Sequence, residues 1–435
     1  MLPSNRALFW EPLRRFFRPL AGSPWWLRIG LIYLATRMVS GAIFAGAALQ
    51  QGPNPWFPPQ PDYLHFLGIW DSEWYQRIFD SGYPSVLPRD TNGAVQQNTW
   101  AFYPVFPLLV RGLAVLTGGS WLILAPIVAT LAGLAASLIC YRLFRHFTKD
   151  RTATWGVMFL LTFPASAILQ VPYAESINLA FLAGALLLVL QRRYYAAVPL
   201  ILLADLSRPV GSAFALFAVL HVVTQLWPGT RSLFGYLPWQ GGSRQSGDLP
   251  SDVTSFRQSG FRLPGFRQGG GMAVMLLASL IGAAAWPVIA WWATGVPSAY
   301  TDTETTWRGG PLVLFQPWLA AAQQYLGLVG GIAGVVLLLL AFLVYFNSAA
   351  VRRIGLDLRL WGLSYTAYLA AVLHPQTSTF RLLLPLFPFA LATAFLVRST
   401  RARWVVLILF LLLQMVWVVW LWAWAPLPGG GDYPP

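Results

Sequence analysis

Two carboxylates stand close together in a chain that has few charged residues. Asp71 and Glu73 are separated by one residue and flanked by Trp70, Trp74 and Tyr75, whereas only 10% of the residues are charged. A carboxylate in such a place can take the proton of an attacking hydroxyl as a general base, with aromatic rings as walls for a substrate. Trp and Tyr also gather at membrane surfaces, so an interfacial aromatic belt with solvated carboxylates is the alternative. The stretch alone does not decide between these two interpretations.

The spacing of the two acids favours one of them as the base. Residues i and i+2 point in opposite directions on an extended strand and lie roughly 200° apart on a helix, so Asp71 and Glu73 do not easily face one cavity. The shorter side chain of Asp71 holds its carboxylate more tightly, as proton transfer requires. On these grounds we expect Asp71 to be the base, with Glu73 as the alternative. Glu73 is expected to act through acceptor binding or through its electric field on Asp71.

The composition predicts an all-α, multi-pass membrane protein. Hydrophobic residues make up 57% of the chain, and several apolar runs reach the ~20 residues that a helix needs to cross a bilayer. The net charge of +14 comes from basic residues in short runs at the ends of apolar segments. This pattern marks cytoplasmic loops, so membrane lipids are expected partners and nucleic acid is not. The one cysteine, Cys140, lies in an apolar run and excludes a disulfide framework.

The positions of the arginines orient the apolar segments within a single polytopic domain, residues 1–435, with a cytoplasmic N-terminus. About eleven spans are expected, at 26–49, 120–141, 152–168, 173–190, 194–207, 210–227, 271–293, 326–346, 357–373, 382–397 and 404–424. Two prolines and a Gly-Gly pair make the apolar run before residue 119 a surface helix rather than a span. The connecting segments are a cytoplasmic lead-in (1–24), an external catalytic loop with surface helices (50–119), a flexible cytoplasmic loop (228–270) and a second external loop (295–325).

This topology brings most of the unusual polar residues to the external side. They are Asp71, Glu73, Tyr173, Glu175, Asp205, Arg208, Asp302, Glu304, Trp307, Arg308, His374 and Arg381. Arg208 and Arg381 either snorkel to the interface or serve a site, and the second is favoured because arginine is disfavoured on this side. Glu175 either complements a helix N-terminus or belongs to the site. We expect Asp302 and Glu304 to be solvated loop acids.

No arrangement of histidines and acids predicts a metal site. His65 and His374 are expected to be loop histidines, and no spacing matches a closed set of ligands. Glycine-rich runs lack the strand and helix of a phosphate-binding loop, so a soluble nucleotide is not the expected donor. An external carboxylate with distant arginines instead suits transfer of a group from a lipid-linked phosphate. The carboxylate would act as base, the arginines would neutralise the departing phosphate, and attack opposite the leaving group would invert the sugar carbon.

Several short motifs resemble the PIG-V (GPI mannosyltransferase 2) family, particularly its bacterial members. In order they are 70–75 (Trp-Asp-Ser-Glu-Trp-Tyr) with 82–83 (Gly-Tyr), 102–108, 173–176 (Tyr-Ala-Glu-Ser), 207–211 (Ser-Arg-Pro-Val-Gly), 295–297 leading to Trp307, and 381–388. The set covers about residues 30–400 of the chain. Two positions depart from the pattern: Leu382 follows Arg381 where an aromatic residue is expected, and Ser207 and Val210 flank Arg-Pro where threonines are expected.

The PIG-V family is similar to the GT-C glycosyltransferases, which are multi-span enzymes that use polyprenyl-phosphate sugars. The resemblance implies an inverting, metal-independent mannosyltransferase with Asp71 as the base, without a cofactor, in the plasma (inner) membrane with an external active site. Its partners would be a polyprenyl-phosphate sugar and a lipid or glycan acceptor. The expected substrate-binding residues are Trp70, Glu73, Trp74, Tyr75, Tyr103, Glu175, Arg208, Trp307, Arg308 and Arg381. The alternatives are a lipid or solute transporter and a non-catalytic glycolipid-binding membrane protein.

Overall fold

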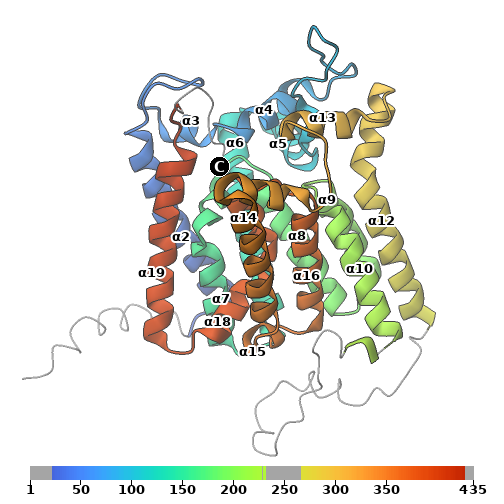
Figure 1. Cartoon of the computed structure of the whole chain (residues 1–435). Helices are drawn as coiled ribbons and strands as arrows, with labels where there is room; N and C mark the ends of the chain where they lie inside the picture. Colours follow the sequence, from blue (N-terminus) through green and yellow to red (C-terminus); the bar gives the residue numbers. More distant parts are fainter. Residues whose placement is uncertain (1–21, 228, 232–265, 427–435) are drawn as a thin grey trace, which may run out of the picture.

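A computed structural model describes residues 22–227, 229–231 and 266–426 as an all-α protein (Figure 1). Over these residues there is no β-strand, and one isolated bridge joins Arg89 to Val95. The predicted all-α membrane fold is confirmed by this helix content and by several long apolar helices. Most of the predicted cytoplasmic lead-in (1–24) and of the predicted cytoplasmic loop (228–270) lies outside the described residues.

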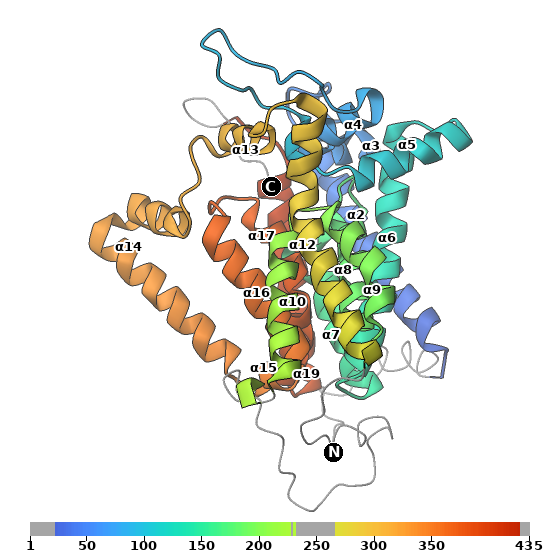
Figure 2. The same ribbon diagram turned by 90° about the vertical axis from the view of Figure 1, so that its right-hand side faces the viewer.

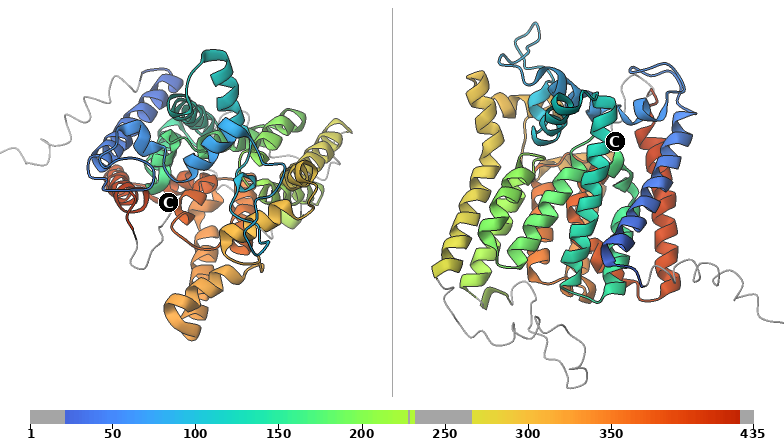
Figure 3. Two further views of the ribbon diagram at one scale, coloured as in Figure 1. Left: turned by 90° about the horizontal axis from the view of Figure 1, so that it is seen from above. Right: turned by 180° about the vertical axis from the view of Figure 1, so that it is seen from behind.

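Five helices among the described residues are long and apolar enough to cross a membrane. They are α2 (Trp25–Ala48), α6 (Trp121–Arg145), α12 (Phe266–Thr294), α14 (Gln316–Phe346) and α19 (Thr400–Val416), which continues into η6 (Trp417–Trp422). Long apolar runs form helices because lipid offers the backbone no hydrogen-bond partner, and a helix satisfies these groups within the segment. Seen from behind in Figure 3, α2 and α19 lie at one edge of the bundle and α12 at the other.

The chain bends sharply within two of the predicted spans. The segment predicted at 152–168 is α7 (Asp150–Thr162) followed by η2 (Pro164–Gln170), with a bend of 82° between them. Phe163 has φ −50° and ψ 141° because the residue before a proline is pushed out of the helical region. The segment predicted at 382–397 bends by 79° before α18 (Pro388–Leu396). Pro385 is the second residue of η5 (Leu384–Leu386) and Pro388 is the first residue of α18, so both prolines lie in the first turn of a helix.

The remaining predicted spans coincide with shorter helices. These are α8 (Glu175–Leu190), α9 (Tyr194–Asp205), α10 (Gly211–Leu226) and α16 (Leu356–Val372). Counting each bent pair as one span raises the number of helices fit to cross from five to seven within the described residues. The helical segments thus match the predicted ones, whereas eleven crossings remain a prediction.

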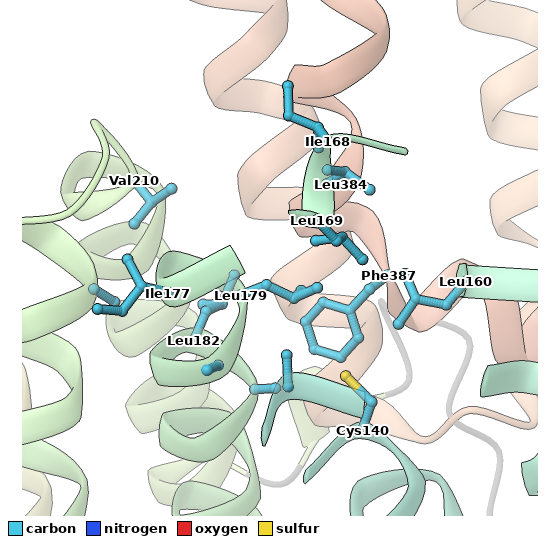
Figure 4. Packing of buried hydrophobic residues seen from close by; sticks show 14 of the residues in the cluster. Cys140, Leu160, Ile168, Leu169, Ile177, Leu179, Leu182, Val210, Leu384 and Phe387 are labelled. Atoms are coloured by element: carbon cyan, nitrogen blue, oxygen red, sulfur yellow. The ribbon is translucent and has the colours of Figure 1, made fainter. Parts of the chain in front are cut away.

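The buried core joins the first half of the chain to its C-terminal part. Figure 4 shows Cys140 of α6, Leu160 of α7, Leu169 of η2 and Leu182 of α8 around Phe387. All five side chains are at most 3% exposed. Lipid tails are as apolar as leucine, so helices in a membrane associate mainly through close packing of their side chains. This packing fixes the positions of the bent segments, which carry site residues at their ends.

Short helices cover one end of the bundle (Figures 1 and 2). They are α3 (Tyr63–Leu67), α4 (Asp71–Ser81), η1 (Thr99–Ala101), α5 (Val105–Thr117) and α13 (Ala299–Arg308), and we call this end the capped end. The segment 295–325, expected as a loop, therefore contains α13 and the first turns of α14. The opposite end carries α15 (Ala349–Arg352).

Helix α14 stands apart from the other long helices in Figure 2 and projects from the bundle in the view from above in Figure 3. It changes direction at Gly327, which has φ 71° and ψ 176°, a conformation that glycine adopts without steric cost. Its first turns are attached to the end of α16 next to the capped end. There Trp318 Nε1 donates to Leu369 O at 2.9 Å, and the Phe315 N–H donates to Ala371 O at 2.9 Å.

Candidate active site

The backbone at the start of α4 fixes the position of Asp71. Trp70, which precedes the helix, has φ 61° and ψ −126°, a region that residues with a side chain rarely occupy. Such strain persists only where the surroundings hold it, and it is common at functional sites. Here Trp70 is buried, and its Nε1 donates to Trp422 O at 2.7 Å. The helix ends at Gly82 (φ 76°), a position that favours glycine.

Asp71 is the first residue of α4 and is held through its backbone and through its side chain. Its N–H, which has no partner within the helix, donates to Tyr173 Oη at 2.9 Å. Its Oδ2 accepts from Arg381 Nη1 at 2.6 Å. The side chain is 14% exposed. Asp71 therefore has a fixed orientation and limited access.

Glu73 points to different partners, as its spacing from Asp71 predicts. Its Oε2 accepts from Trp56 Nε1 at 2.9 Å, and its Oε1 pairs with Arg77. The side chain is 39% exposed. The acid expected to act as base is thus the one that joins a buried ion-pair network, whereas Glu73 lies at the surface.

Arg381 connects Asp71 to a second carboxylate. Its Nη1 lies 3.1 Å from Glu175 Oε1 as well as 2.6 Å from Asp71 Oδ2, and Arg208 Nη1 lies 3.3 Å from the same Glu175 oxygen. Two acids and two arginines balance in charge, which offsets part of the cost of removing them from water. Arg381 Nε and Glu175 Oε2 remain buried without a hydrogen-bond partner.

These residues border a cavity of about 210 Å³ beneath the capped end. Its polar lining includes five of the predicted site residues, namely Glu175, Arg208, Trp307, Arg308 and Arg381. Asp71 is not part of the lining but is joined to it through Arg381. Three guanidinium groups thus line the cavity, and one of them, that of Arg381, forms an ion pair with the Asp71 carboxylate. Such a set can bind an anionic group and accept a proton beside it.

Helix α13 contributes further polar side chains to the cavity lining. Glu304 and Arg308 both line it, and Arg308 Nη2 lies 3.3 Å from Glu304 Oε2. The expectation that Glu304 is a solvated loop acid is wrong, because its side chain is only 21% exposed. Burial raises the pKa of the Glu304 carboxyl, against the effect of Arg308. Periodicity in a polar segment of ten residues was too weak to predict this helix or its inner face.

Three other predicted substrate-binding residues, Trp74, Tyr75 and Tyr103, lie outside the cavity lining. Trp74 stacks on Phe102, with ring centroids 5.9 Å apart and planes 5° apart, and contacts the edge of Trp307 at 5.1 Å. Tyr75 is 1% exposed and packs against Phe102 and Phe106. Tyr103 Oη lies 3.2 Å from Tyr300 Oη, away from the cavity lining. These rings position the residues that line the cavity.

Sequence reasoning missed one wall of the cavity. Tyr365, Tyr368, Leu369 and Val372 of α16 line it at the spacing of a single helix face. The available signal was a pair of tyrosines three residues apart near the external end of a predicted span. His374, expected to be a loop histidine, also lines the cavity. Among the described residues, no group of three or more His, Cys, Asp or Glu side chains could hold a metal ion.

No family model and no curated protein matches the chain. Among solved structures, the chain is similar to ArnT from Cupriavidus metallidurans bound to undecaprenyl phosphate, with 14% sequence identity and a TM-score of 0.45 over 87% of this chain and 62% of that one. It is also similar to an Archaeoglobus fulgidus oligosaccharyltransferase tethered with an acceptor peptide, with 14% identity and a TM-score of 0.39 over 89% of this chain and 55% of that one. The chain thus spans less than two thirds of either protein. The resemblance to the PIG-V family remains a prediction.

Proposed function

We propose that the chain is an inverting membrane glycosyltransferase that uses a polyprenyl-phosphate sugar as donor. The acceptor is a hydroxyl group of a lipid or glycan at the capped end. We infer mannose as the sugar from the resemblance to the PIG-V family. The capped end is proposed to face the outside of the plasma (inner) membrane, where no cytoplasmic nucleotide sugar is available.

The proposal rests above all on the link between Asp71 and the cavity. Arg381 Nη1 contacts Asp71 Oδ2 and also borders the cavity that Arg208 and Arg308 line. A single ion pair therefore connects the proposed base to the proposed phosphate-binding side chains. Arginine suits this role because its planar fork of donors matches the oxygens of a phosphate group. The aromatic side chains of α13 and α16 add apolar walls, as expected for a ligand pocket.

The reaction follows from these positions. The donor phosphate binds the arginines and competes with Asp71 for the guanidinium of Arg381, which releases the Asp71 carboxylate. Asp71 takes the proton of the acceptor hydroxyl as the new bond to the anomeric carbon forms. The bond between that carbon and the phosphate oxygen breaks, and its electron pair leaves with polyprenyl phosphate. The arginines neutralise the added negative charge, and attack opposite the leaving group inverts the anomeric carbon.

The arginines supply the stabilisation of phosphate charge that a divalent cation supplies in other enzymes, so we propose a metal-independent reaction. No cofactor is needed because the lipid-linked sugar is already activated. Glu175 is a positioning residue in this mechanism. Its Oε1 forms ion pairs with both Arg208 and Arg381 and keeps the two guanidinium groups side by side.

The test is transfer by the purified full-length protein in lipid nanodiscs. Undecaprenyl-phosphate-mannose labelled in the sugar is supplied with a bacterial membrane lipid extract, and parallel reactions contain undecaprenyl-phosphate-glucose or GDP-mannose. We expect a labelled acceptor and free undecaprenyl phosphate with the first donor, and no transfer from GDP-mannose. Preferred transfer of glucose would overturn mannose as the sugar. Release of no undecaprenyl phosphate from either lipid donor would overturn the transferase proposal.

A further inference from the structure

The glutamate and arginine side chains that line the cavity fall into two groups. Glu175, Arg208 and Arg381 lie at the ends of α8, α9 and the bent segment before α18. Glu304 and Trp307 belong to α13, which is connected to the bundle through Gly295 and Gly309. The first group carries two of the cavity's arginines. The second group also includes Arg308, while Glu304 and Trp307 add a carboxyl and an indole, which are not the side chains that a phosphate needs.

Glu304 and Trp307 lie three residues apart and therefore occupy neighbouring positions on one face of α13. The Trp307 Nε1 is buried and has no hydrogen-bond partner, although buried polar atoms are usually paired. The ring itself is held by T-shaped contacts with Trp74 and Phe102, whose ring centroids lie 5.1 Å and 5.5 Å from its own. A fixed aromatic ring with an unpaired donor at the cavity is thus placed one helical turn from a carboxyl.

The Glu304 carboxyl is also held in place. It pairs with Arg308 and lies one helical turn from Tyr300, whose hydroxyl lies 3.2 Å from that of Tyr103. Helix α13 is attached to the first loop of the capped end, where Thr303 pairs with Asn98 at 2.9 Å. This support explains how a carboxyl with a raised pKa keeps its orientation next to the cavity.

We propose that Glu304 and Trp307 form the subsite for the donor sugar, while Arg208 and Arg381 hold its phosphate. This inference rests on the proposed function. A carboxyl oxygen accepts from sugar hydroxyls, the Trp307 N–H donates to one, and the indole ring covers the apolar face of the sugar. A phosphate would be repelled by an ionised Glu304, whereas a neutral sugar is not. The lipid tail offers no hydroxyl to either side chain.

The test compares a lipid phosphate that carries the sugar with one that lacks it. The full-length protein in nanodiscs is titrated, without acceptor, with undecaprenyl phosphate and with undecaprenyl-phosphate-mannose, and binding is followed by isothermal titration calorimetry. We expect Glu304→Gln to weaken binding of the mannose-bearing ligand roughly tenfold or more and to change binding of the sugar-free ligand less than about twofold. Trp307→Phe, which keeps an aromatic ring and removes the N–H, should show the same selectivity with a several-fold loss. Asp302→Asn, on the same helix but outside the cavity lining, is the matched control and should leave both affinities unchanged.

The possible outcomes separate this inference from the proposed function. An equal loss of affinity for both ligands in Glu304→Gln would overturn the sugar subsite, because the residue would then act on the phosphate or on the fold. Unchanged binding of both ligands in both variants would also overturn it. Failure of the unmodified protein to bind either ligand would overturn the proposed function together with the subsite. If the variants weaken binding of the mannose-bearing ligand alone, this result supports the sugar subsite even without a transfer assay.

Discussion

Arg381 Nη1 lies 2.6 Å from Asp71 Oδ2, so the proposed base and a proposed phosphate-binding residue already form an ion pair. The same nitrogen lies 3.1 Å from Glu175 Oε1, and both side chains of this second pair are less than a tenth exposed. A phosphate that takes hydrogen bonds from Arg381 therefore competes directly with Asp71. Donor binding and release of the base are linked through one guanidinium group.

We expect Arg381→Ala to weaken binding of undecaprenyl phosphate about 10- to 150-fold, because a charge-assisted contact is worth ~1.5–3 kcal/mol. Arg381→Lys should restore little of this affinity, since an ammonium group cannot form the same fork of hydrogen bonds. Ligand titration in nanodiscs measures both effects. Arg111→Ala, at an exposed position on α5, is the control and should bind normally. Unchanged affinity in each of Arg208→Ala, Arg308→Ala and Arg381→Ala would remove the arginines from the donor site.

The stability of the protein should depend on pH through Glu304. Burial raises the pKa of this carboxyl, so the folded protein binds the proton more tightly than the unfolded chain does. This contribution to stability is present at low pH and is lost as pH rises through the raised pKa. We expect Glu304→Gln, which keeps the shape and cannot ionise, to have a midpoint of thermal unfolding higher by on the order of 1 °C at neutral pH.

The difference in midpoint between Glu304→Gln and the unmodified protein should shrink on acidification, as the native carboxyl takes up its proton. Differential scanning fluorimetry in detergent over a series of pH values measures it. Asp302→Asn serves as the control and should show no such dependence. A difference that grows as pH falls would contradict the pKa shift assigned to Glu304.

Charge and hydropathy patterns were sufficient to predict the membrane fold and the association of distant residues. Arginine is disfavoured at external span ends, which singled out Arg208 and Arg381, and the structure brings both to Glu175. The divergence of Asp71 and Glu73 follows from helix geometry alone. The two sharp bends were harder to predict, because a proline in an apolar run is compatible with a kinked span or with a broken one.

Local sequence patterns could not predict the polar residues that α13 contributes to the cavity. Glu304 lies in a polar segment where a solvated loop and a short helix share the same composition. Its burial depends on contacts made by residues far earlier in the chain, such as the hydrogen bond from Asn98 to Thr303. The tyrosines of α16 were missed for a related reason. They face the cavity because of how the helix is rotated in the bundle, and a span whose apolar residues are spread around the whole helix does not encode this rotation strongly.

Chelation should leave the reaction unaffected if the arginines alone neutralise the phosphate. We expect turnover in the presence of excess EDTA to stay within about twofold of the untreated rate. The measurement is the initial rate of mannose transfer before and after chelation, with Mg²⁺ or Mn²⁺ added back as a control. A large loss of rate that either cation restores would show that a metal takes part.

The orientation in the membrane can be tested with single cysteines at exposed positions. Ser81→Cys, at the end of α4, should react with an impermeant maleimide in intact cells, and Asn347→Cys, at the opposite end of the bundle, should react only after permeabilisation. Native Cys140 is fully buried and should stay unreactive in both variants. The reverse labelling pattern would place the site in the cytoplasm and overturn the proposed topology.

The identity of the base is tested most directly by comparing turnover in Asp71→Asn and Glu73→Gln at saturating donor. Asparagine keeps the shape of Asp71 and can still accept a hydrogen bond from Arg381, but it cannot take the proton of the acceptor. Loss of a general base costs ~10²–10⁴ in rate, and we expect this loss in Asp71→Asn with a much smaller one in Glu73→Gln. Thermal unfolding of each variant must match the unmodified protein, because a misfolded α4 would mimic lost chemistry. Near-normal turnover in Asp71→Asn would contradict the assignment of Asp71 as the base.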